Sequence, residues 1–303
     1  MTSDYTNGLV SIILPAYNTP ENFLLQAIDS VIAQSYTNWE LLIIDDSTIA
    51  PVETIVGRYQ DARIKYFRNS KNLGMADSRN RGLELAEGEF IALLDHDDVW
   101  LPEKLSVQIK LIQQSKCNMV YSPVTFFGDE QFNSVIQHNV SFHDLLIGHN
   151  IVSCSCVLIR TELIRQFDLK FQTKAVPADD YTMWLAIALY GGNIECTDQY
   201  LVQYRKHTDN VSGTPLVCYR PYEWILKDIS HQLFKTGYPF RYKFKCWITI
   251  LRSRTWVLRK VIKEDTAQSK QEKLLMSLKA IQIWPFHPAN WLLLIKNCFG
   301  HQK

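Results

Sequence analysis

Short apolar runs alternate with segments of helical periodicity through the first half of the chain. Residues 10–17 (VSIILPAY) hold six apolar positions in eight without alternation, the pattern of a strand buried on both faces. Pro20 then precedes apolar residues at helical spacing over residues 23–32, which predicts a helix. The same alternation predicts strands at residues 39–46, 63–67 and 89–94, and a helix at residues 76–86 before Gly88.

Strands and helices in this order predict a doubly wound α/β layer. In such sheets, ligands bind outside the carboxyl ends of the strands. Three polar clusters fall at predicted strand ends, at residues 15–18, 45–47 and 95–98. We therefore expect these clusters to lie at one edge of the sheet and to form a ligand site.

The pattern loosens after about residue 115. Extended segments are predicted at residues 118–122, 155–159 and 200–205, and a helix at residues 179–189. Beyond Pro215 the chain becomes helical, aromatic and basic. These changes predict a first domain over residues 1–214, with halves of about 1–115 and 116–214, and a helical extension over residues 215–303.

Composition narrows the class of protein. Of the 303 residues, 47% are hydrophobic and 21% are charged, as in soluble globular proteins, and the net charge of +1 argues against a nucleic-acid partner. No apolar run approaches the ~18–20 residues of a membrane-spanning helix, and the first residues do not resemble a signal peptide. The seven cysteines form no CxxC pair, so we expect reduced thiols in a cytoplasmic protein.

The acidic cluster DHDD at residues 95–98 directly follows an apolar run. Carboxylates this close repel one another unless solvent or a cation intervenes. Oxygen ligands at a strand end suit Mg²⁺ or Mn²⁺, which bind through one or two carboxylates plus substrate phosphates. The alternative interpretation of this cluster is an acidic turn exposed to solvent. His96 is expected to point to the other side, and Asp98 to cap or support the turn before Pro102.

Two other acidic pairs each have a structural and a functional interpretation. Asp45 and Asp46 suit a turn or a helix N-cap, and also a carboxylate contact to a bound nucleoside. Asp179 and Asp180 begin a predicted helix, where acids commonly cap. No basic residue lies in that turn, so a carboxylate there could instead serve as a general base toward a hydroxyl.

Arg205 and His207 stand two apart on a predicted strand, so both side chains should face the same way. His207 is then either a structural residue or the imidazole that completes an oxygen-rich metal site.

Four stretches together carry a family resemblance: VSIILPAYN, LLIIDDST, NLGMADSRNRGLELAEGEFIALLDHDDVWLPEKL and ADDYTMWL. They resemble the family 2 inverting glycosyltransferases of bacterial surface-polysaccharide synthesis. The likeness is continuous over about residues 10–111 and resumes in patches to about residue 212. It implies a GT-A fold, an α/β architecture with a mixed, mostly parallel sheet flanked by helices.

The resemblance also implies roles for single residues. Those that match the family's nucleotide-sugar site are Pro15, Ala16, Tyr17, Asp45, Asp46, Arg79, Asn80, Asp95 and His96. Asp97, with Asp95 and His207, matches the metal site of the DxD motif. Asp180 matches the catalytic base of the family's "ED" pair, in which Asp179 replaces the usual Glu. DDST likewise replaces the commoner DDGS after the second strand.

The implied reaction is a single displacement that inverts the anomeric carbon of a nucleotide diphosphate sugar, with UDP preferred, and depends on Mn²⁺ or Mg²⁺. The implied acceptor is a hydroxyl of a glycan or a lipid-linked saccharide. A catalytically silent sugar-nucleotide-binding or scaffolding protein is the alternative outside enzymes. A nucleotidyltransferase is disfavoured, because PAYNTPENF lacks a Gly-rich, basic phosphate loop.

From Lys235 to Lys263 the chain carries nine Lys or Arg and no acid. Apolar residues near one helical face of this segment include Phe244, Trp247 and Leu251. Either the helix packs on the first domain, or it binds anionic lipid headgroups at the inner face of the cell membrane.

Overall fold

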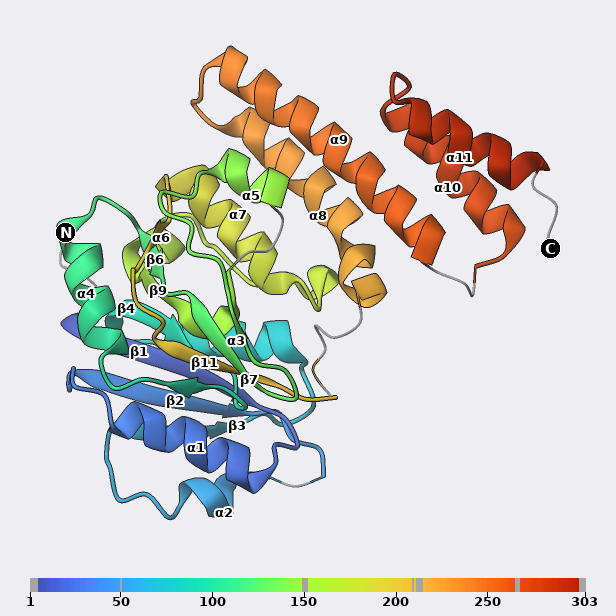
Figure 1. Cartoon of the computed structure of the whole chain (residues 1–303). Coiled ribbons are helices and arrows are strands. Elements are labelled where there is room, and N and C mark those ends of the chain that lie inside the picture. Colours follow the sequence, from blue (N-terminus) through green and yellow to red (C-terminus); the bar gives the residue numbers. More distant parts are fainter. Residues whose placement is uncertain are drawn as a thin grey trace. The chain divides into compact units, whose positions relative to one another are not determined.

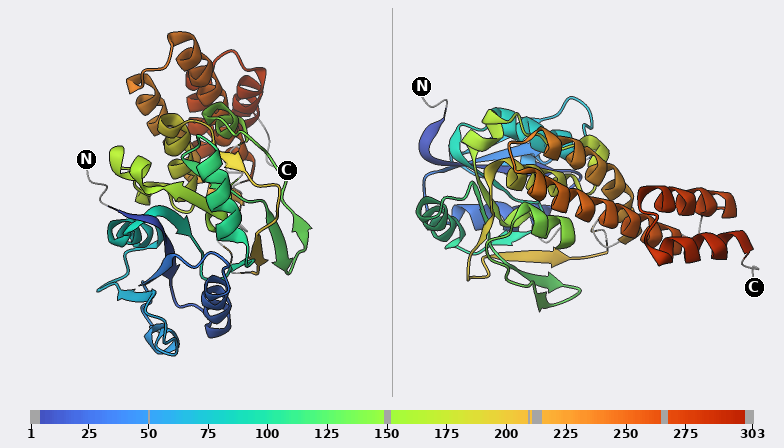
Figure 2. Two further views of the ribbon diagram at one scale, coloured as in Figure 1. Left: turned by 90° about the vertical axis from the view of Figure 1, so that its left-hand side faces the viewer. Right: turned by 90° about the horizontal axis from the view of Figure 1, so that it is seen from above.

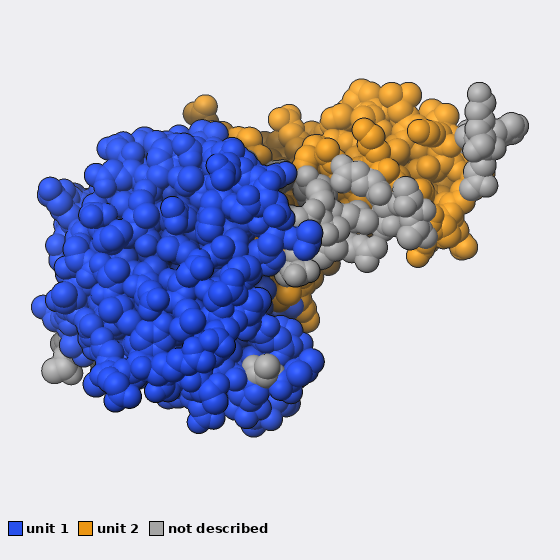
Figure 3. Space-filling view, turned by 60° about the horizontal axis from the view of Figure 1, so that its bottom comes forward, with its two compact units in different colours: residues 1–142, 150–173, 179–208 blue, residues 143–149, 174–178, 209–303 orange. Residues whose placement is uncertain are grey.

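The computed structural model describes residues 5–49, 51–148, 152–208, 210, 215–264 and 268–299. The chain forms two compact units, coloured separately in Figure 3. The first comprises residues 1–142, 150–173 and 179–208, and the second comprises residues 143–149, 174–178 and 209–303. A domain boundary after residue 214 remains a prediction.

The first unit is built on a seven-stranded sheet with the order β10-β6-β9-β4-β1-β2-β3. Its strands are β1 (Thr6–Ala16), β2 (Trp39–Asp45), β3 (Ile64–Arg68), β4 (Gly88–Leu93), β6 (Met119–Tyr121), β9 (Val157–Arg160) and β10 (Glu195–Cys196). β1 runs parallel to β2 and β4, β2 is parallel to β3, and β10 is parallel to β6. Only β9 is antiparallel to its neighbours. The predicted mixed, mostly parallel sheet is confirmed.

Helices cover both faces of this sheet, and in Figure 1 α1 and α7 lie on opposite sides of it (Figures 1 and 2). The helices of the first unit are α1 (Glu21–Ile32), α2 (Glu53–Val56), α3 (Met75–Leu85), α4 (Lys104–Gln114), α6 (Thr161–Gln166) and α7 (Asp179–Gly191). Every residue of β2 is buried, as expected for a strand covered on both faces. Gly82 of α3 allows close packing on β1, since a Cβ there would lie 2.3 Å from Ile13 Cγ2.

A second sheet of four short strands was predicted only in part. Its order is β5-β11-β7-β8, with β5 at Val99–Trp100, β11 at Val202–Lys206, β7 at Val124–Gly128 and β8 at Phe132–Asn133. β11 coincides with the extended segment predicted at residues 200–205. Its antiparallel pairing with β5 brings the chain before His207 next to the chain after the DHDD cluster.

The second unit is helical, as predicted. It holds α8 (Pro215–Lys235), α9 (Phe240–Glu264), α10 (Lys270–Ile283), α11 (Pro288–Phe299) and most of α5 (Phe142–Gly148). The predicted apolar face of α9 is partly wrong: Phe244 is exposed, whereas Cys246, Ile250 and Val257 are buried. None of the described helices combines the length and apolar character that crossing a bilayer requires.

Candidate functional site

The loops after β1 and β2 are tied together at the carboxyl edge of the main sheet. Asp46 N donates to Ala16 O at 2.8 Å, and Asn18 N donates to Ser47 Oγ at 2.9 Å. Pro15 is half-buried near the carboxyl end of β1, and Tyr17, just beyond that end, is 48% exposed. β4, which precedes the DHDD cluster, is the other neighbour of β1. The three polar clusters therefore share one sheet edge, as predicted.

Asp45 and Asp46 are both buried, and their carboxylates accept hydrogen bonds from the neighbouring loops. Asp45 accepts hydrogen bonds from Ser47 N, Val52 N and Tyr66 Oη at 2.9, 3.0 and 2.7 Å. Asp46 accepts from the chain that leads into α3, from Asn69 Nδ2, Leu73 N and Gly74 N at 2.7, 2.8 and 2.8 Å. The turn-stabilising interpretation is thus observed for both acids, and a contact of Asp46 to a nucleoside stays a prediction.

Asp97 lies in the turn between β4 and β5, and its side chain contacts that of His207, which follows β11. His207 Nε2 lies 3.0 Å from Asp97 Oδ2, and both side chains are partly exposed. Arg205 faces the same way, as predicted, because its Nε donates to Asp97 O at 2.8 Å. Its guanidinium lies between the rings of Phe23 and Phe127, at 4.3 and 4.4 Å from their centroids. Arg205 therefore holds the acidic turn against β11.

Asp98 is fully buried and links three segments of the first unit. Its Oδ2 accepts from Ser155 Oγ at 2.5 Å and its Oδ1 accepts from Arg205 N at 3.0 Å. Burial, and then the neighbouring Asp97 and Asp95 carboxylates, raises the pKa of Asp98 well above its usual range. Asp98 thus supports the turn before Pro102, as one of its two predicted roles has it, by joining that turn to β11 and to the segment before β9.

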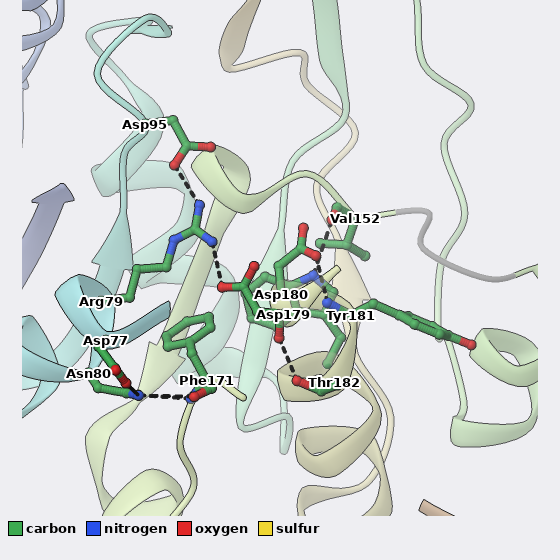
Figure 4. A network of polar contacts seen from close by, with 11 residues as sticks. Asp77, Arg79, Asn80, Asp95, Val152, Phe171, Asp179, Asp180, Tyr181 and Thr182 are labelled. Atoms are coloured by element: carbon green, nitrogen blue, oxygen red, sulfur yellow. Dashed lines mark hydrogen bonds and ion pairs between the residues drawn. The ribbon is translucent and has the colours of Figure 1, made fainter. Parts of the chain in front are cut away.

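Arg79 lies between two acidic clusters that are far apart in sequence. Nη2 donates to Asp95 Oδ1 and Nη1 donates to Asp179 Oδ2, each at 2.8 Å (Figure 4). Burial acts to lower the pKa of Arg79, but the surrounding negative groups, including both carboxylates, raise it well above its usual range. The guanidinium is therefore charged and joins the start of α7 to the DHDD turn.

Asn80 stabilises a neighbouring loop. Its Nδ2 donates to Phe171 O at 2.9 Å and its Oδ1 accepts from Phe171 N at 2.8 Å (Figure 4). Arg79 and Asn80, both predicted in the nucleotide-sugar site, thus form these contacts within the protein. A contact of either residue to a nucleotide stays a prediction.

Asp179 and Asp180 begin α7 but differ in their surroundings. Asp179 is fully buried on Arg79, and its Oδ1 has no hydrogen-bond partner among the described residues. Asp180 is half-buried, and its Oδ1 accepts from Tyr181 N at 2.7 Å. A buried, unsatisfied carboxylate oxygen is uncommon in native structures, and a catalytic role is one explanation for it. The less buried Asp180 is the acid better placed to exchange a proton with a substrate.

Asp97 Oδ2 and His207 Nε2 are two neighbouring atoms of the types that can bind a divalent cation. Within the part of the chain that the structure describes, no three His, Cys, Asp or Glu side chains converge on one point, and Asp95 is bonded to Arg79. A carboxylate and an imidazole fit Mn²⁺ or Mg²⁺ when substrate phosphates complete the ligand set. His96 Nδ1 is buried and also lacks a hydrogen-bond partner among the described residues.

Sequence reasoning left two residues of this site unassigned. The side chain of Arg205 was expected to point the same way as that of His207, but the sequence did not predict its role. Its aromatic neighbours Phe23 and Phe127 come from α1 and β7, which are distant in the sequence. Ser155 gave no signal, since its bonds join Asp98 and the Asp95 backbone amide, about 60 residues away in sequence. Spacing alone cannot identify contacts of this kind.

Comparisons with known proteins show what this chain is similar to. A model of the protein family described as "Glycosyl transferase family 2" matches residues 11–183. The chain is 35% identical over 209 residues to the Escherichia coli UDP-Glc:alpha-D-GlcNAc-diphosphoundecaprenol beta-1,3-glucosyltransferase WfgD, covering 68% of this chain and 80% of that protein. It is 31% identical over 207 residues to WfaP of Escherichia coli, which carries the same activity name, with coverages of 68% and 80%.

Two solved structures have similar folds. S. aureus TarS 1–349 in complex with UDP superposes with a TM-score of 0.75 at 16% identity, covering 95% of this chain and 88% of that chain. The mannosyltransferase PcManGT from Pyrobaculum calidifontis, in complex with GDP-Man and Mn²⁺, has a TM-score of 0.59 at 17% identity, with coverages of 97% and 88%.

Proposed function

The chain belongs to glycosyl transferase family 2 and has the GT-A fold, and we propose that it moves a hexose from a UDP-sugar to a hydroxyl of a glycan or lipid-linked oligosaccharide, with inversion. The names of WfgD and WfaP state a UDP-Glc donor and a diphosphoundecaprenol-linked acceptor, and TarS was solved with UDP. These names support a UDP-sugar and a lipid-linked acceptor for this chain.

One observation carries the proposal: Arg79 joins Asp179 to Asp95. This bridge fixes the first turn of α7 beside the acidic turn after β4. Asp180 follows Asp179, and Asp97 follows Asp95 by two residues, so the candidate base and the candidate diphosphate site belong to one rigid arrangement. A general base and a leaving-group site held together in this way suit a direct displacement.

In the proposed mechanism, Asp180 accepts the proton of the acceptor hydroxyl as that oxygen attacks the anomeric carbon from the face opposite the nucleotide. Asp179 remains bound to Arg79 and orients the turn. The sugar–oxygen bond to the diphosphate breaks as the new glycosidic bond forms, so no covalent enzyme intermediate is needed.

Asp97 and His207 would hold Mn²⁺ or Mg²⁺, and Arg205 would keep the Asp97 backbone in position. Bound there, the ion neutralises negative charge on the diphosphate leaving group. The Mn²⁺ in the PcManGT structure supports this choice of ion.

The proposed location is cytoplasmic, with peripheral contact to an anionic membrane through the C-terminal extension. Lipid-linked acceptors of related enzymes, and the nine basic residues over residues 235–263 of this chain, support that contact. A silent sugar-nucleotide-binding or scaffolding protein of the same fold remains the alternative, and it predicts donor binding without turnover.

The test is transfer from a panel of UDP-, GDP- and dTDP-hexoses with Mn²⁺ or Mg²⁺, with the anomeric configuration of the product read by NMR. Asp180→Asn should lower the transfer rate by about 10²–10⁴ while UDP binding and thermal stability stay near the parent values. Asp129→Asn, at an exposed acid, is the matched control. An Asp180→Asn variant that transfers sugar at the parent rate would show that the base is another group. Donor binding without transfer to any acceptor by the parent would favour the scaffolding alternative.

A further inference from the structure

The α10–α11 hairpin has small and polar side chains on its inner seam. Ser277, Ala280 and Asn290 are each fully buried. Asn290 Nδ2 donates to Ala280 O at 3.1 Å and to Trp284 O at 2.8 Å, and Asn297 Nδ2 donates to Ser277 Oγ at 2.9 Å. Hydrogen bonds of buried polar side chains therefore contribute to the contact between the two helices.

Large apolar side chains instead lie on the outside of this hairpin. We define its outer face by the exposed side chains Leu275 (59%), Leu278 (47%), Phe286 (83%), Trp291 (47%), Leu292 (66%) and Ile295 (53%). Leu275 and Leu278 are three residues apart on α10, and Trp291 and Ile295 are four apart on α11, so each pair shares one side of its helix.

The middle of α9, by contrast, is already covered. Ile250, Val257 and Leu258 are buried, and α9 packs against both α8 and α10. The basic segment predicted to bind lipid therefore uses most of its apolar side chains for packing within the second unit. Only its first turns expose aromatic rings, at Phe240 and Phe244.

The charges near the outer face are mainly positive. Residues 268–299 contain four lysines and one acid, and that acid, Glu272, belongs to the capping box of α10 with Ser269. The nearby carboxylate of Glu223 is shared by Lys279 and Arg254. An exposed apolar surface on a segment with this charge balance is complementary to a negatively charged partner.

We propose that the outer face of the α10–α11 hairpin docks on an anionic lipid surface. The apolar side chains would enter the boundary between headgroups and acyl chains, while the lysines contact the headgroup phosphates. A second copy of this chain fits less well, because a symmetric contact would bring the lysines of both copies together. This inference rests on the membrane contact in the proposed function and assigns that contact to a specific surface. Lipid binding can be tested without sugar transfer.

The experiment is co-sedimentation of the full-length chain with phosphatidylcholine vesicles, with and without phosphatidylglycerol, in the absence of donor and acceptor. Trp291→Ser/Ile295→Ser and Leu275→Ser/Leu278→Ser should each lower the affinity for the anionic vesicles by about tenfold or more. The Lys270→Gln/Lys296→Gln variant should also bind the vesicles more weakly than the parent does, and this loss of affinity should grow with the phosphatidylglycerol content of the vesicles. Val135→Ser, at an apolar residue of the first unit that is 85% exposed, is the matched control and should bind as the parent does.

Circular dichroism and sedimentation velocity on the same variants separate the outcomes. The proposal is overturned if a folded Trp291→Ser/Ile295→Ser variant binds anionic vesicles like the parent, or if only Phe240→Ser/Phe244→Ser loses binding. It is also overturned if the serine variants change the oligomeric state and leave vesicle binding unaltered, because the occupant would then be a second copy. Sugar transfer is measured separately, so a failure here leaves the catalytic proposal intact.

Discussion

The guanidinium of Arg79 donates from Nη1 to Asp179 Oδ2 at 2.8 Å, between residues 100 positions apart in the sequence. Asp179 is fully buried beside this partner. The other Nη of Arg79 binds Asp95. One buried cation thus sets the position of both the candidate base turn and the candidate metal turn.

Replacing Arg79 should therefore cost both stability and activity. Arg79→Met would leave Asp179 buried without a counter-charge, and breaking a buried pair in this way costs about 3–5 kcal/mol of unfolding free energy. Arg79→Lys should lose less stability, but a lysine lacks the planar fork that reaches two carboxylates at once, so sugar transfer should remain low. Urea unfolding and initial transfer rates measure the two effects.

The matched control is Arg58→Lys, because the Arg58–Glu21 pair is about half exposed on both sides and should contribute little. The double variant Arg79→Met/Asp179→Asn should regain part of the stability lost in Arg79→Met. Equal stability of Arg79→Met and the parent would contradict the bridge.

The sequence could predict the elements but not this bridge. The strands β1 and β2 could be predicted because their apolar runs are local and uninterrupted, and for the same reason Asp45 could be placed at the end of one strand and Asp97 after another. The turn at Asp179 lacked a basic neighbour in the sequence, and its counter-charge comes from α3. β5, β7 and β8 hold two to five residues each, too few for a periodic pattern, and their pairing depends on distant partners.

The same limit applies to the C-terminal helices. Helical periodicity on α9 placed Phe244 on the apolar face, yet Phe244 is exposed, and Cys246 and Ile250 are buried. Which side of an amphipathic helix is covered depends on the neighbouring helices, whose positions the pattern of one segment does not contain.

Removing the metal donors should weaken cation binding before it affects folding. Asp97→Ala should raise the Mn²⁺ concentration needed for half-maximal binding in the presence of UDP by about tenfold or more, and His207→Ala by less, because a neutral imidazole contributes less than a charged carboxylate. Mn²⁺ electron paramagnetic resonance reports the binding directly.

A surface pair of the same residue types supplies the control for that measurement. His138 lies 3.3 Å from Asp198, which is 91% exposed, so His138→Ala and Asp198→Ala should leave Mn²⁺ binding unchanged. If Asp97→Ala binds Mn²⁺ with parental affinity, the ion is held elsewhere.

Asp46 offers a test between its two interpretations. Its carboxylate accepts from two backbone amides and Asn69 Nδ2, and Asp46→Asn would place an amide group against at least one of these donors. We expect a loss of about 1–3 kcal/mol in unfolding free energy, measured by chemical denaturation. Asp168→Asn, at an acid whose side chain is 83% exposed, should be near neutral. A fall in UDP affinity with unchanged stability would instead favour a direct contact between Asp46 and the nucleotide.

Lys104 gives the chain a pH-dependent stability. Its side chain is fully buried, with Nζ 2.8 Å from Gln108 Oε1 and 3.9 Å from the centroid of the Trp100 ring. Burial lowers the pKa of Lys104 from 10.5 to about 7. Between pH 7 and 10.5 the unfolded chain therefore binds a proton that the folded chain does not, so the free energy of unfolding should rise with pH across this window.

Lys104→Met should remove that dependence. The variant should be more stable than the parent by a few kcal/mol near and below pH 7, where the parent carries a buried charge, and this advantage should shrink as the pH approaches 10.5. Lys110→Met, at an exposed lysine of the same helix, is the control and should show no such trend. Thermal unfolding from pH 6 to 10 measures the difference. A gap between Lys104→Met and the parent that stays constant over this range would mean that Lys104 keeps the same protonation state in the folded and unfolded chains.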